Sequence, residues 1–310
     1  MSEALIVSEG LGFSYGQHAV LEGIDLAIDA GEIFGLVGPD GAGKTTLLRI
    51  AAGQLEPSEG QIRVLGEAPS TPALRHDLAY MPQGFGLYPD LSVAENLGFF
   101  ADLHGLDRAT ASERLQSLLE RTGLAGFEDR RGGQLSGGMM QKLALGCVLV
   151  SAPRVMFLDE PTTGVDPVSR RAFWRLLDGV REEGVAILYA TANMDEAERC
   201  ERVAMLEAGR LRRQGTPLEL VSRHQAILAS ISGPHVRSYR ERVRALEAVE
   251  VVFPMGPRLN CWLRPGASLE DLHQGLQAID ERLAARALTP GLHDAALREL
   301  ALRDSGDGHG

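Results

Sequence analysis

The spacing of hydrophobic and polar residues changes several times along the chain, and each spacing predicts a type of element. Residues 4–30 alternate between apolar and polar side chains, which predicts antiparallel strands. We expect residues 13–16 to form the turn between them. The runs at 33–37, 154–161 and 185–190 are apolar without alternation, which is typical of strands buried on both faces of a parallel sheet. The first half of the chain therefore predicts an α/β fold.

Helical periodicity separates these runs. It dominates residues 93–123, where Ser92 is a predicted N-cap with Glu95 three positions later. Further helices are predicted at 45–52, 137–150 and 168–182, and further strands at 61–65, 78–83 and 203–213, the last as a hairpin. Alternating strands and helices indicate crossover connections in a parallel sheet.

The pattern changes again beyond residue 222. A helix is predicted at 236–248, strands at 250–254 and 258–263, and a helix at 269–286 whose N-cap is Ser268. We therefore expect a large domain over residues 1–222, a small α+β extension over 226–303 that is regulatory or serves dimerisation, and a disordered polar tail over 304–310. Trp262 is predicted to belong to the core of the extension.

A glycine-rich stretch follows the first buried strand. Residues 38–46 match the phosphate-binding P-loop pattern, and the candidate phosphate ligands are Gly38, Asp40, Gly41, Ala42, Gly43, Lys44, Thr45 and Thr46. Glycines allow several N–H groups to approach one anion, Lys44 supplies a charge for the β- and γ-phosphates, and the Thr45 hydroxyl suits Mg²⁺. Only Lys44 and Lys142 are lysine among 31 basic residues, which favours a specific role for Lys44.

Two other stretches carry chemistry of the same kind. Asp159 and Glu160 end a buried strand, where α/β sheets bind ligands; Asp159 is a candidate metal ligand and Glu160 a candidate general base. Ser136 caps a helix whose first residues, Gly137 and Gly138, leave the backbone N–H groups open to an anion. An ordinary capped helix is the alternative.

Two assignments near the predicted site are less specific. Tyr15 either fills a strand or stacks on an adenine ring, and its position upstream of a P-loop favours stacking. Gln83 ends the strand at 78–83. The following residues, 84–90, form a loop rich in large apolar groups, which either packs on its own domain or docks a partner.

Composition narrows the class of protein. A net charge of −11 disfavours nucleic-acid binding. Cys147, Cys200 and Cys261 are far apart and form neither a metal pattern nor a disulfide framework, which suits a reducing cytosol. No apolar run is long enough to span a membrane, and residues 1–10 lack the basic region of a signal peptide. We therefore expect a soluble protein that stays in the compartment where it is made.

Taken in order over residues 4–220, these motifs resemble the nucleotide-binding subunit of ATP-binding cassette (ABC) transporters. The P-loop is shared with other NTPases, whereas the segment 135–141 is specific to this family. The resemblance implies a P-loop NTPase core with a RecA-like parallel sheet, an antiparallel β subdomain and an α-helical subdomain. It also implies ATP and Mg²⁺ as ligands.

The resemblance also assigns roles by position. It implies that Tyr15 stacks on adenine, that Thr45, Gln83 and Asp159 lie around Mg²⁺, and that Glu160 and Gln83 act on the attacking water. It implies that Ser136, Gly137 and Gly138 close over the γ-phosphate held by a second subunit, and that Asp166 lies in the loop that crosses this interface.

Three positions depart from the family pattern. Asp40 replaces the usual Asn or Ser, so we expect its carboxylate to face away from the phosphates. Met139 stands where Gln is commoner. Ala192 stands where the family places a histidine that contacts the γ-phosphate, and a methyl group can neither donate to phosphate nor move a proton. Loss of one such contact typically lowers a rate by about 10²–10³, so we expect slow hydrolysis at this site.

The leading hypothesis is thus the ATPase subunit of an exporter of the drug or antibiotic type, bound to separate integral-membrane permease subunits and to a second ATPase subunit, identical or different. It would be peripheral on the inner face of the cell membrane. A regulatory subunit that binds ATP with little hydrolysis is an alternative, and so is a non-transport ABC protein acting on ribosomes or DNA.

Overall fold

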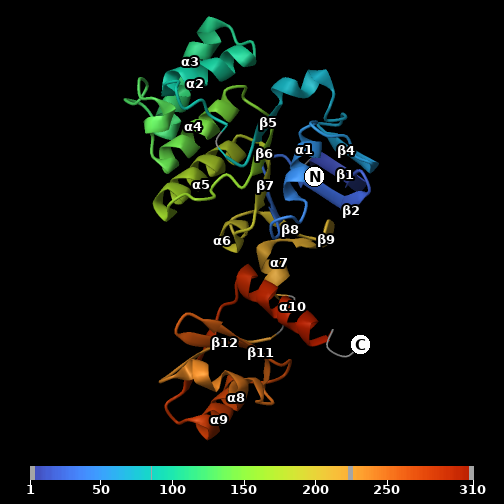
Figure 1. The fold of residues 1–310 in the computed structure, drawn as a ribbon, viewed down its shortest axis with the longest axis vertical. Helices are drawn as coiled ribbons and strands as arrows, with labels where there is room; N and C mark the ends of the chain where they lie inside the picture. The colour runs from blue at the N-terminus through green and yellow to red at the C-terminus, as the bar shows by residue number, and fades with distance from the viewer. Residues whose placement is uncertain (1–3, 85, 223–225, 307–310) are drawn as a thin grey trace. The chain divides into compact units, whose positions relative to one another are not determined.

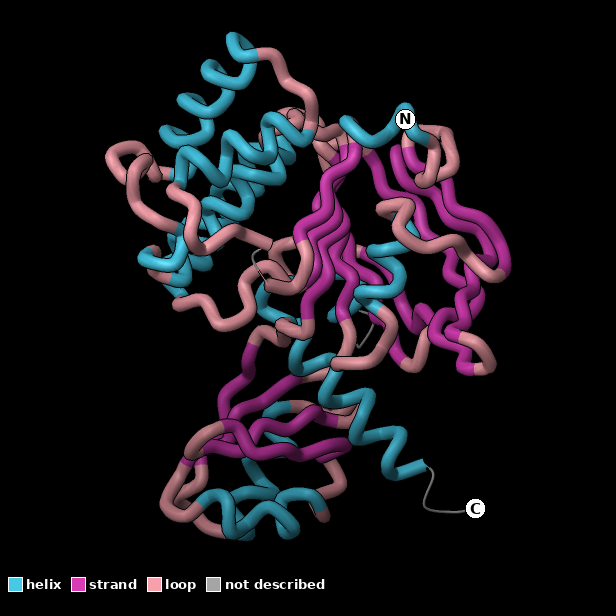
Figure 2. The backbone as a smooth tube through the Cα atoms, turned by 45° about the horizontal axis from the view of Figure 1, so that its top comes forward, coloured by secondary structure: helices cyan, strands magenta, loops and turns pink. Residues whose placement is uncertain are grey.

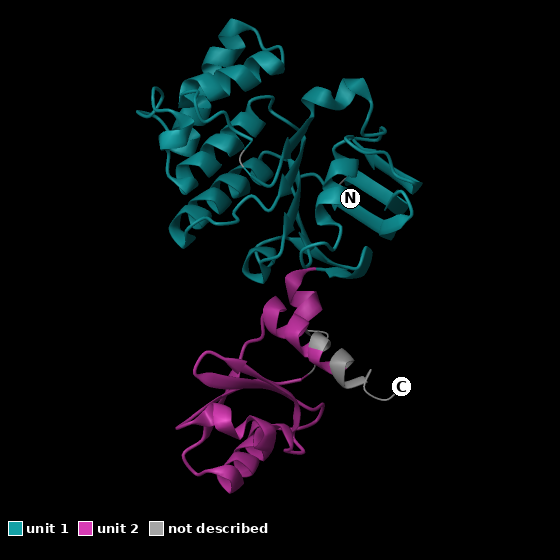
Figure 3. Ribbon diagram, viewed as in Figure 1, with its two compact units in different colours: residues 1–215 teal, residues 216–310 magenta. Residues whose placement is uncertain are grey.

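In a computed structural model of the chain, the structure describes residues 4–84, 86–222 and 226–306. The chain divides into two compact units, residues 1–215 and residues 216–310 (Figure 3). Each unit has its own sheets and its own hydrophobic core. The boundary lies within the final residues of the predicted large domain.

The first unit is organised around a six-stranded sheet of order β5-β6-β7-β3-β8-β9 (Figure 1). The first five strands run parallel and β9 pairs antiparallel to β8. The strands are β3 (Ile33–Val37), β5 (Leu78–Met81), β6 (Val155–Asp159), β7 (Ala186–Thr191), β8 (Arg202–Glu207) and β9 (Arg210–Gly215). Every residue of β3, β6 and β7 is buried, as expected for the central strands of a covered parallel sheet.

A three-stranded antiparallel sheet of order β2-β1-β4 lies on one side of this sheet, with helix α1 between the two (Figures 1 and 2). Its strands are β1 (Ala4–Tyr15), β2 (His18–Asp29) and β4 (Glu59–Val64), and α1 spans Lys44–Ala51. The turn of the β1–β2 hairpin is Gly16 and Gln17, so the prediction that residues 13–16 form it was wrong for residues 13–15, which belong to β1. The pairing of Phe13 with Leu21 keeps Phe13 and Tyr15 in the strand.

Helices cover the other side of the six-stranded sheet (Figure 1). They are α2 (Val93–Leu103), α3 (Arg108–Thr122), α4 (Gly137–Leu149) and α5 (Pro167–Glu182), with a short helix α6 (Met194–Ala197) after β7. The single helical stretch predicted over 93–123 is two helices, because Gly105 takes a left-handed conformation and Asp107 caps a new helix. The predicted caps at Ser92 and Ser136 are confirmed. Cys147 is buried among the leucines of this layer.

The second unit is an α+β unit with a four-stranded antiparallel sheet of order β11-β12-β10-β13. Its elements are α7 (Pro217–Ser222), β10 (Leu228–Ser232), α8 (Arg240–Arg244), β11 (Val249–Met255), β12 (Arg258–Leu263), α9 (Leu269–Ile279), β13 (Ala284–Leu288) and α10 (Leu292–Gly306). Trp262 is fully buried, which confirms its predicted place in the core. Because α10 reaches Gly306, the first residues of the predicted tail are helical, and 307–310 lie outside the described residues.

Two predicted helices of this unit are shorter than expected. The helix predicted at 269–286 ends at Ile279, because Asp280 accepts hydrogen bonds from the backbone and the guanidinium of Arg282 and turns the chain into β13. The helix predicted at 236–248 is a 3₁₀ turn over Val236–Tyr239 followed by α8. Both differences occur in short segments, where tertiary contacts outweigh helical periodicity.

Candidate functional site

Four of the parallel strands end at one edge of the six-stranded sheet, and the predicted site residues follow their carboxyl ends. The P-loop follows β3, Gln83 follows β5, Glu160 follows β6 and Ala192 follows β7. In α/β sheets this edge is where ligands bind. The parallel pairing of β6 with β7 and of β7 with β3 sets these segments next to one another.

Two glycines of the P-loop are required by its geometry. A Cβ atom on Gly38 would collide with the carbonyl oxygen of Leu206, and Gly43 has a φ of 107°, a conformation that other residues rarely adopt. Gly43 precedes the first residue of α1, so the open N–H groups at the start of this helix face the loop. The backbone is thus shaped to hold an anion.

The Lys44 side chain is buried at the centre of this loop. Its Nζ donates hydrogen bonds to the carbonyl oxygens of Gly38 at 2.8 Å and Pro39 at 3.1 Å, and lies 3.0 Å from Oε1 of Glu160. The Asp40 side chain is 94% exposed, but its Oδ1 lies 3.9 Å from Nζ of Lys44 and Asp40 lines the hollow beside the P-loop, so the expectation that its carboxylate faces away is not confirmed. The ammonium group is therefore held at the mouth of the P-loop close to the Glu160 carboxylate, with the Asp40 carboxylate farther away.

Glu160 occupies a strained backbone position immediately after β6. Its φ is 48°, in the left-handed region that is unfavourable for a residue with a Cβ, and its N–H donates to the Ala190 carbonyl of β7 at 3.0 Å. Its carboxylate meets Lys44 and accepts from the amide of Gln83 at 3.5 Å and the hydroxyl of Thr163 at 3.3 Å. The strain turns the carboxylate out of the sheet and toward the P-loop.

Asp159, the preceding residue, is 1% exposed. Its Oδ2 accepts a hydrogen bond from the hydroxyl of Tyr80 at 3.2 Å, while its Oδ1 has no hydrogen-bond partner among the described residues. Burial, then the charge of Asp159, raises the pKa of Tyr80, so this hydroxyl stays protonated and donates. Sequence reasoning did not single out Tyr80; its alternation with buried Ala79 and Met81 in β5 was the available signal.

The P-loop, Gln83 and Glu160 line one hollow of about 450 Å³. Its lining includes both candidate catalytic residues, Gln83 and Glu160, and most of the P-loop; the full set is Val20, Asp40, Gly41, Gly43, Lys44, Thr45, Thr46, Gln83 and Glu160. The fold therefore places these candidate residues around one hollow. Larger surface hollows elsewhere, such as one over Ile50–Ser70, lack this set of charged groups.

Tyr15, Asp159 and the 136–138 segment are absent from the described lining of this hollow. Tyr15 ends β1, is 50% exposed, and packs edge-on against Phe13 with ring centroids 4.8 Å apart. Ser136 is exposed and accepts a hydrogen bond from the Met139 N–H at 3.3 Å. Within one chain, then, the P-loop and the capped helix start belong to different surfaces.

The 136–138 segment is packed against the start of α5. A Cβ on Gly138 would collide with the side chain of Ser169, and the Asp166 carboxylate caps α5 by accepting the N–H groups of Val168 and Ser169. The hydroxyl and N–H of Ser169 lower the pKa of Asp166. Gly138 is thus required by a close approach between two helices, whereas Gly137 has open space around it.

Fold and site together define a P-loop nucleotide-binding protein with a helical layer inserted beside the parallel sheet. A family model described as "ABC transporter" matches residues 21–163. The chain is 36% identical over 311 residues to the Nod factor export ATP-binding protein I of Paraburkholderia xenovorans (strain LB400), with 99% of this chain and 98% of that protein covered. The chain belongs to the ABC transporter family and is one of its ATP-binding proteins.

Other relatives agree with this assignment. The chain is 41% identical over 278 residues to the probable multidrug ABC transporter ATP-binding protein YbhF of Escherichia coli (strain K12), with 88% of this chain covered; it spans about half the length (48%) of that relative. Among solved structures, cbiO1 from Clostridium perfringens, part of the ABC transporter complex cbiONQ, matches with a TM-score of 0.67 and 29% identity over 77% of this chain and 96% of that one. The ATP-binding fold predicted from the motifs is confirmed.

A membrane-spanning helix needs about 20 consecutive, mostly apolar residues. Each helix in the part of the chain that the structure describes is too short or too polar to cross a bilayer.

Proposed function

We propose that this chain hydrolyses ATP in order to energise export through separate permease subunits. The observation that carries the proposal is the convergence of Lys44, Glu160 and Gln83 on a single hollow at the carboxyl ends of the parallel strands. A cation for phosphate, a base for water and an amide to orient that water are the groups that phosphoryl transfer to water requires. Relatives named for multidrug transport and Nod factor export support the exporter assignment.

In the proposed reaction, a water oxygen attacks the γ-phosphorus, the bond to the β-phosphate oxygen breaks, and ADP and inorganic phosphate form. Glu160 accepts the proton of the attacking water, and Gln83 orients that water. Lys44 exchanges its contact with Glu160 for the phosphate oxygens, which frees the carboxylate to act as a base. Tyr15 would stack on the adenine ring.

Mg²⁺ would suit the oxygen atoms that Asp159, Thr45 and Gln83 offer. The buried Oδ1 of Asp159, without a hydrogen-bond partner among the described residues, is an oxygen that a hard cation can satisfy. The hydroxyl of Thr45 and the amide of Gln83 complete an all-oxygen set from this chain. A bound Mg²⁺ would supply charge that neutralises the phosphates, and these three residues would hold it.

Ser136, Gly137 and Gly138 would serve a second subunit. They do not line the hollow of their own chain among the described residues, yet they present a capped helix start suited to phosphate. We therefore propose a composite site in which these residues face the ATP on a partner ATPase subunit, identical or different. Asp166 would lie at the same interface.

Ala192 limits turnover at the chain's own site. It is exposed at the end of β7, next to the strand that carries Glu160, and offers a methyl group where a donor to the γ-phosphate would be expected. A second candidate function follows from this observation, that of a regulatory subunit that binds ATP and closes on its partner with little hydrolysis. Single-turnover hydrolysis separates the two.

The permease would dock on the apolar loop 84–88 and the neighbouring face of α2. Tyr88 and Phe99 are 46% and 38% exposed and pack with ring centroids 4.7 Å apart, and Leu103 is 66% exposed. Phe85 lies outside the described residues. Binding there would place the chain at the inner face of the membrane. The second unit would serve regulation or dimerisation, and nucleic acid is not a proposed partner.

The composite site can be tested with a charge placed on the capped helix start. In a Glu160→Gln background, which slows hydrolysis, we expect ATP with Mg²⁺ to drive association of subunits in size-exclusion chromatography. Adding S136E should abolish association, because its carboxylate would face the partner's phosphates. The ATP dissociation constant should stay within about threefold of the parent, since the P-loop of each chain is unchanged. The matched control is S268E, at the N-cap of α9 in the second unit. Association that survives S136E would contradict the composite site.

A further inference from the structure

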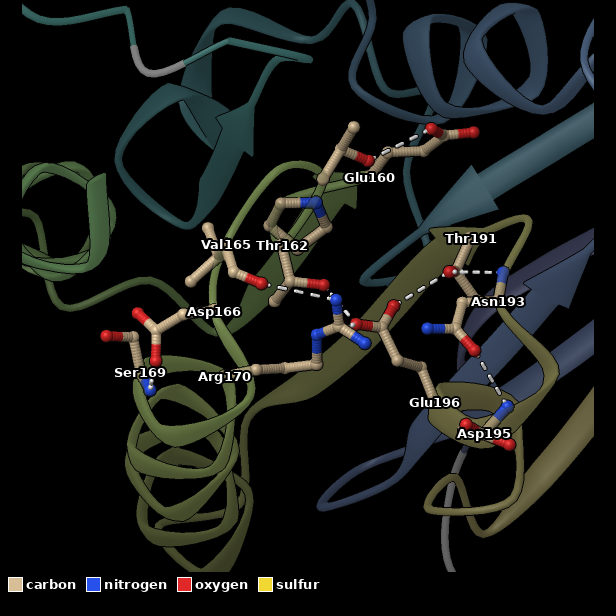
Figure 4. A network of polar contacts seen from close by, with 12 residues as sticks. Glu160, Thr162, Val165, Asp166, Ser169, Arg170, Thr191, Asn193, Asp195 and Glu196 are labelled. Atoms are coloured by element: carbon tan, nitrogen blue, oxygen red, sulfur yellow. Dashed lines mark hydrogen bonds and ion pairs between the residues drawn. The ribbon is translucent and has the colours of Figure 1, made fainter.

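A buried carboxylate lies beside the proposed site and has no part in the chemistry above. Glu196 belongs to the short helix α6 and is 3% exposed. Figure 4 shows its side chain directed toward Thr162, Arg170 and Thr191, which come from three other segments. A buried charge is costly unless it is paired and hydrogen-bonded, so an arrangement of this kind needs a structural or functional reason.

The Glu196 carboxylate accepts hydrogen bonds from three hydroxyls and forms an ion pair with a guanidinium. The hydroxyls of Thr162, Tyr189 (3.0 Å) and Thr191 (2.8 Å) donate to it, and Nε of Arg170 lies 3.4 Å from its Oε1. Burial, then the charge of Glu196, raises the pKa of Tyr189 well above its ordinary value, so this hydroxyl stays protonated and donates. An ionised carboxylate has about four acceptor positions; the hydroxyls take three of them, and Arg170 pairs with the carboxylate by charge without a hydrogen bond from Nε.

The partners of Glu196 reach the two segments that flank the proposed γ-phosphate position. On one side, Thr162 follows Glu160 by two residues, and Arg170 donates from Nη2 to the carbonyl of Val165 at 3.3 Å. Both contacts hold the loop 162–166, which ends at Asp166, the cap of α5.

On the other side, the Thr191 hydroxyl donates to Glu196 and accepts the N–H of Asn193 at 2.9 Å, so it spans Ala192. The carbonyl of Thr191 accepts the N–H of Gly38 at 3.3 Å, which extends the connection to the P-loop. One carboxylate therefore links the loop after β6, the segment after β7 and the start of the P-loop.

We propose that Glu196, paired with Arg170, is a positioning residue that couples the loop 162–166 to the segment 191–193 during hydrolysis. This inference rests on the proposed function, because it assigns a role within the same site. The loop 162–166 would transmit contact with the partner subunit, and the 191–193 segment would respond through Thr191. Because the methyl group of Ala192 cannot donate a hydrogen bond, the backbone of the 191–193 segment is the part that can be positioned.

The chemistry of the network predicts which changes disturb it. Glu196→Gln is nearly isosteric but brings an amide that donates toward hydroxyls and a guanidinium that also donate, so at least one contact is lost. Thr191→Val keeps the shape of the side chain and removes both hydrogen bonds of the hydroxyl. Thr191→Ser keeps the hydroxyl and serves as the conservative rescue.

The test compares these variants in the full-length protein by four measurements. They are the dissociation constant for ATP with Mg²⁺, the midpoint of thermal unfolding, the single-turnover rate of hydrolysis, and ATP-driven association in the Glu160→Gln background. The matched control is Thr122→Val, which removes another buried hydroxyl, one that donates to the Leu118 carbonyl at 2.7 Å in α3, away from this network.

We expect T191V and E196Q to bind ATP within about threefold of the parent and to hydrolyse it at least tenfold more slowly, because small misplacement of reacting groups costs up to about 10²-fold. T191S should restore the rate, and T122V should leave it unchanged. In a parent without measurable hydrolysis, the same order of effects is expected in ATP-driven association.

Two results would overturn the inference. One is a T191V protein that hydrolyses ATP and associates like the parent. The other is a loss of rate that is matched by an equal loss in T122V or that follows the unfolding midpoint, since a merely structural role predicts both. Failure of the proposed function is a different result, in which the parent itself neither binds ATP nor associates with it.

Discussion

The carboxyl ends of β6 and β7 are neighbours in one sheet, but the side chains at the two ends differ in charge. Strand β6 ends at Asp159, whose carboxylate is buried. Glu160 follows it with a strained backbone conformation, and its carboxylate faces Lys44. Strand β7 ends in Thr191 and Ala192, where neither side chain carries a charge. Under the proposed function, the residues at the end of β6 would supply the groups for the metal and the attacking water, while those at the end of β7 would lack a donor to the γ-phosphate.

The largest effect is expected from neutralising the end of β6. Glu160→Gln removes the proposed general base, and we expect the single-turnover rate to fall by about 10²–10⁴ with ATP affinity retained. Glu182→Gln, in a side chain that is 73% exposed on α5, is the control and should leave the rate unchanged. A rate within about threefold of the parent would remove Glu160 from its proposed role, because general-base catalysis contributes far more than that.

A gain in the rate of hydrolysis is expected when a hydrogen-bond donor is added at the end of β7. Ala192→His introduces a donor beside the γ-phosphate, and we expect hydrolysis to rise by about 10-fold or more, since one such donor typically contributes about 10²–10³. The measurement is steady-state phosphate release with the partner subunit present. Ala192→Leu, which adds bulk without a donor, should give no gain. If both variants behave alike, the comparison between the strands does not explain the rate.

Much of this comparison could be predicted from the sequence, for a physical reason. Strands buried on both faces need uninterrupted apolar runs, so β3, β6 and β7 are visible as such, and the polar residues that end them mark the ligand-binding edge. The outward direction expected of Asp40 from the repulsion between an acid and phosphates is not confirmed, because its Oδ1 lies 3.9 Å from Nζ of Lys44.

The remainder depends on contacts between distant positions. Glu196 is 34 residues from Thr162 and 26 from Arg170, and nothing in either local pattern indicates that they meet. The overlong helix predicted at 269–286 failed for a similar reason, because β13 is held by pairing with β10 and not by its own periodicity. Tyr80 was missed because a strand tyrosine is ordinarily core filling.

Tyr80 offers a smaller test of how β6 is prepared for Mg²⁺. Tyr80→Phe removes the hydroxyl that donates to Oδ2 of Asp159 and leaves the ring in place. Loss of such an outer hydrogen bond typically weakens metal affinity by about 10–100-fold, so we expect the Mg²⁺ concentration for half-maximal hydrolysis to rise by about 10-fold. Tyr239→Phe is the matched control, since its hydroxyl donates to Asp280 at 3.0 Å in the second unit. An unchanged Mg²⁺ requirement in Y80F would argue against Asp159 as a metal ligand.

The smallest effect is expected at the far side of Ala192. Asn193 caps α6 by accepting the Asp195 N–H at 3.0 Å, so Asn193→Ala leaves that donor without its partner. We expect a loss of about 1 kcal/mol in the free energy of unfolding, typical of an N-cap, which corresponds to about 2–4 °C in the unfolding midpoint for a unit of this size. Asn193→Asp keeps the accepting oxygen and should recover the stability. If N193A lowers hydrolysis far more than stability, then the end of β7 depends on the exact placement of Ala192, and the contrast with β6 is one of positioning as well as of charge.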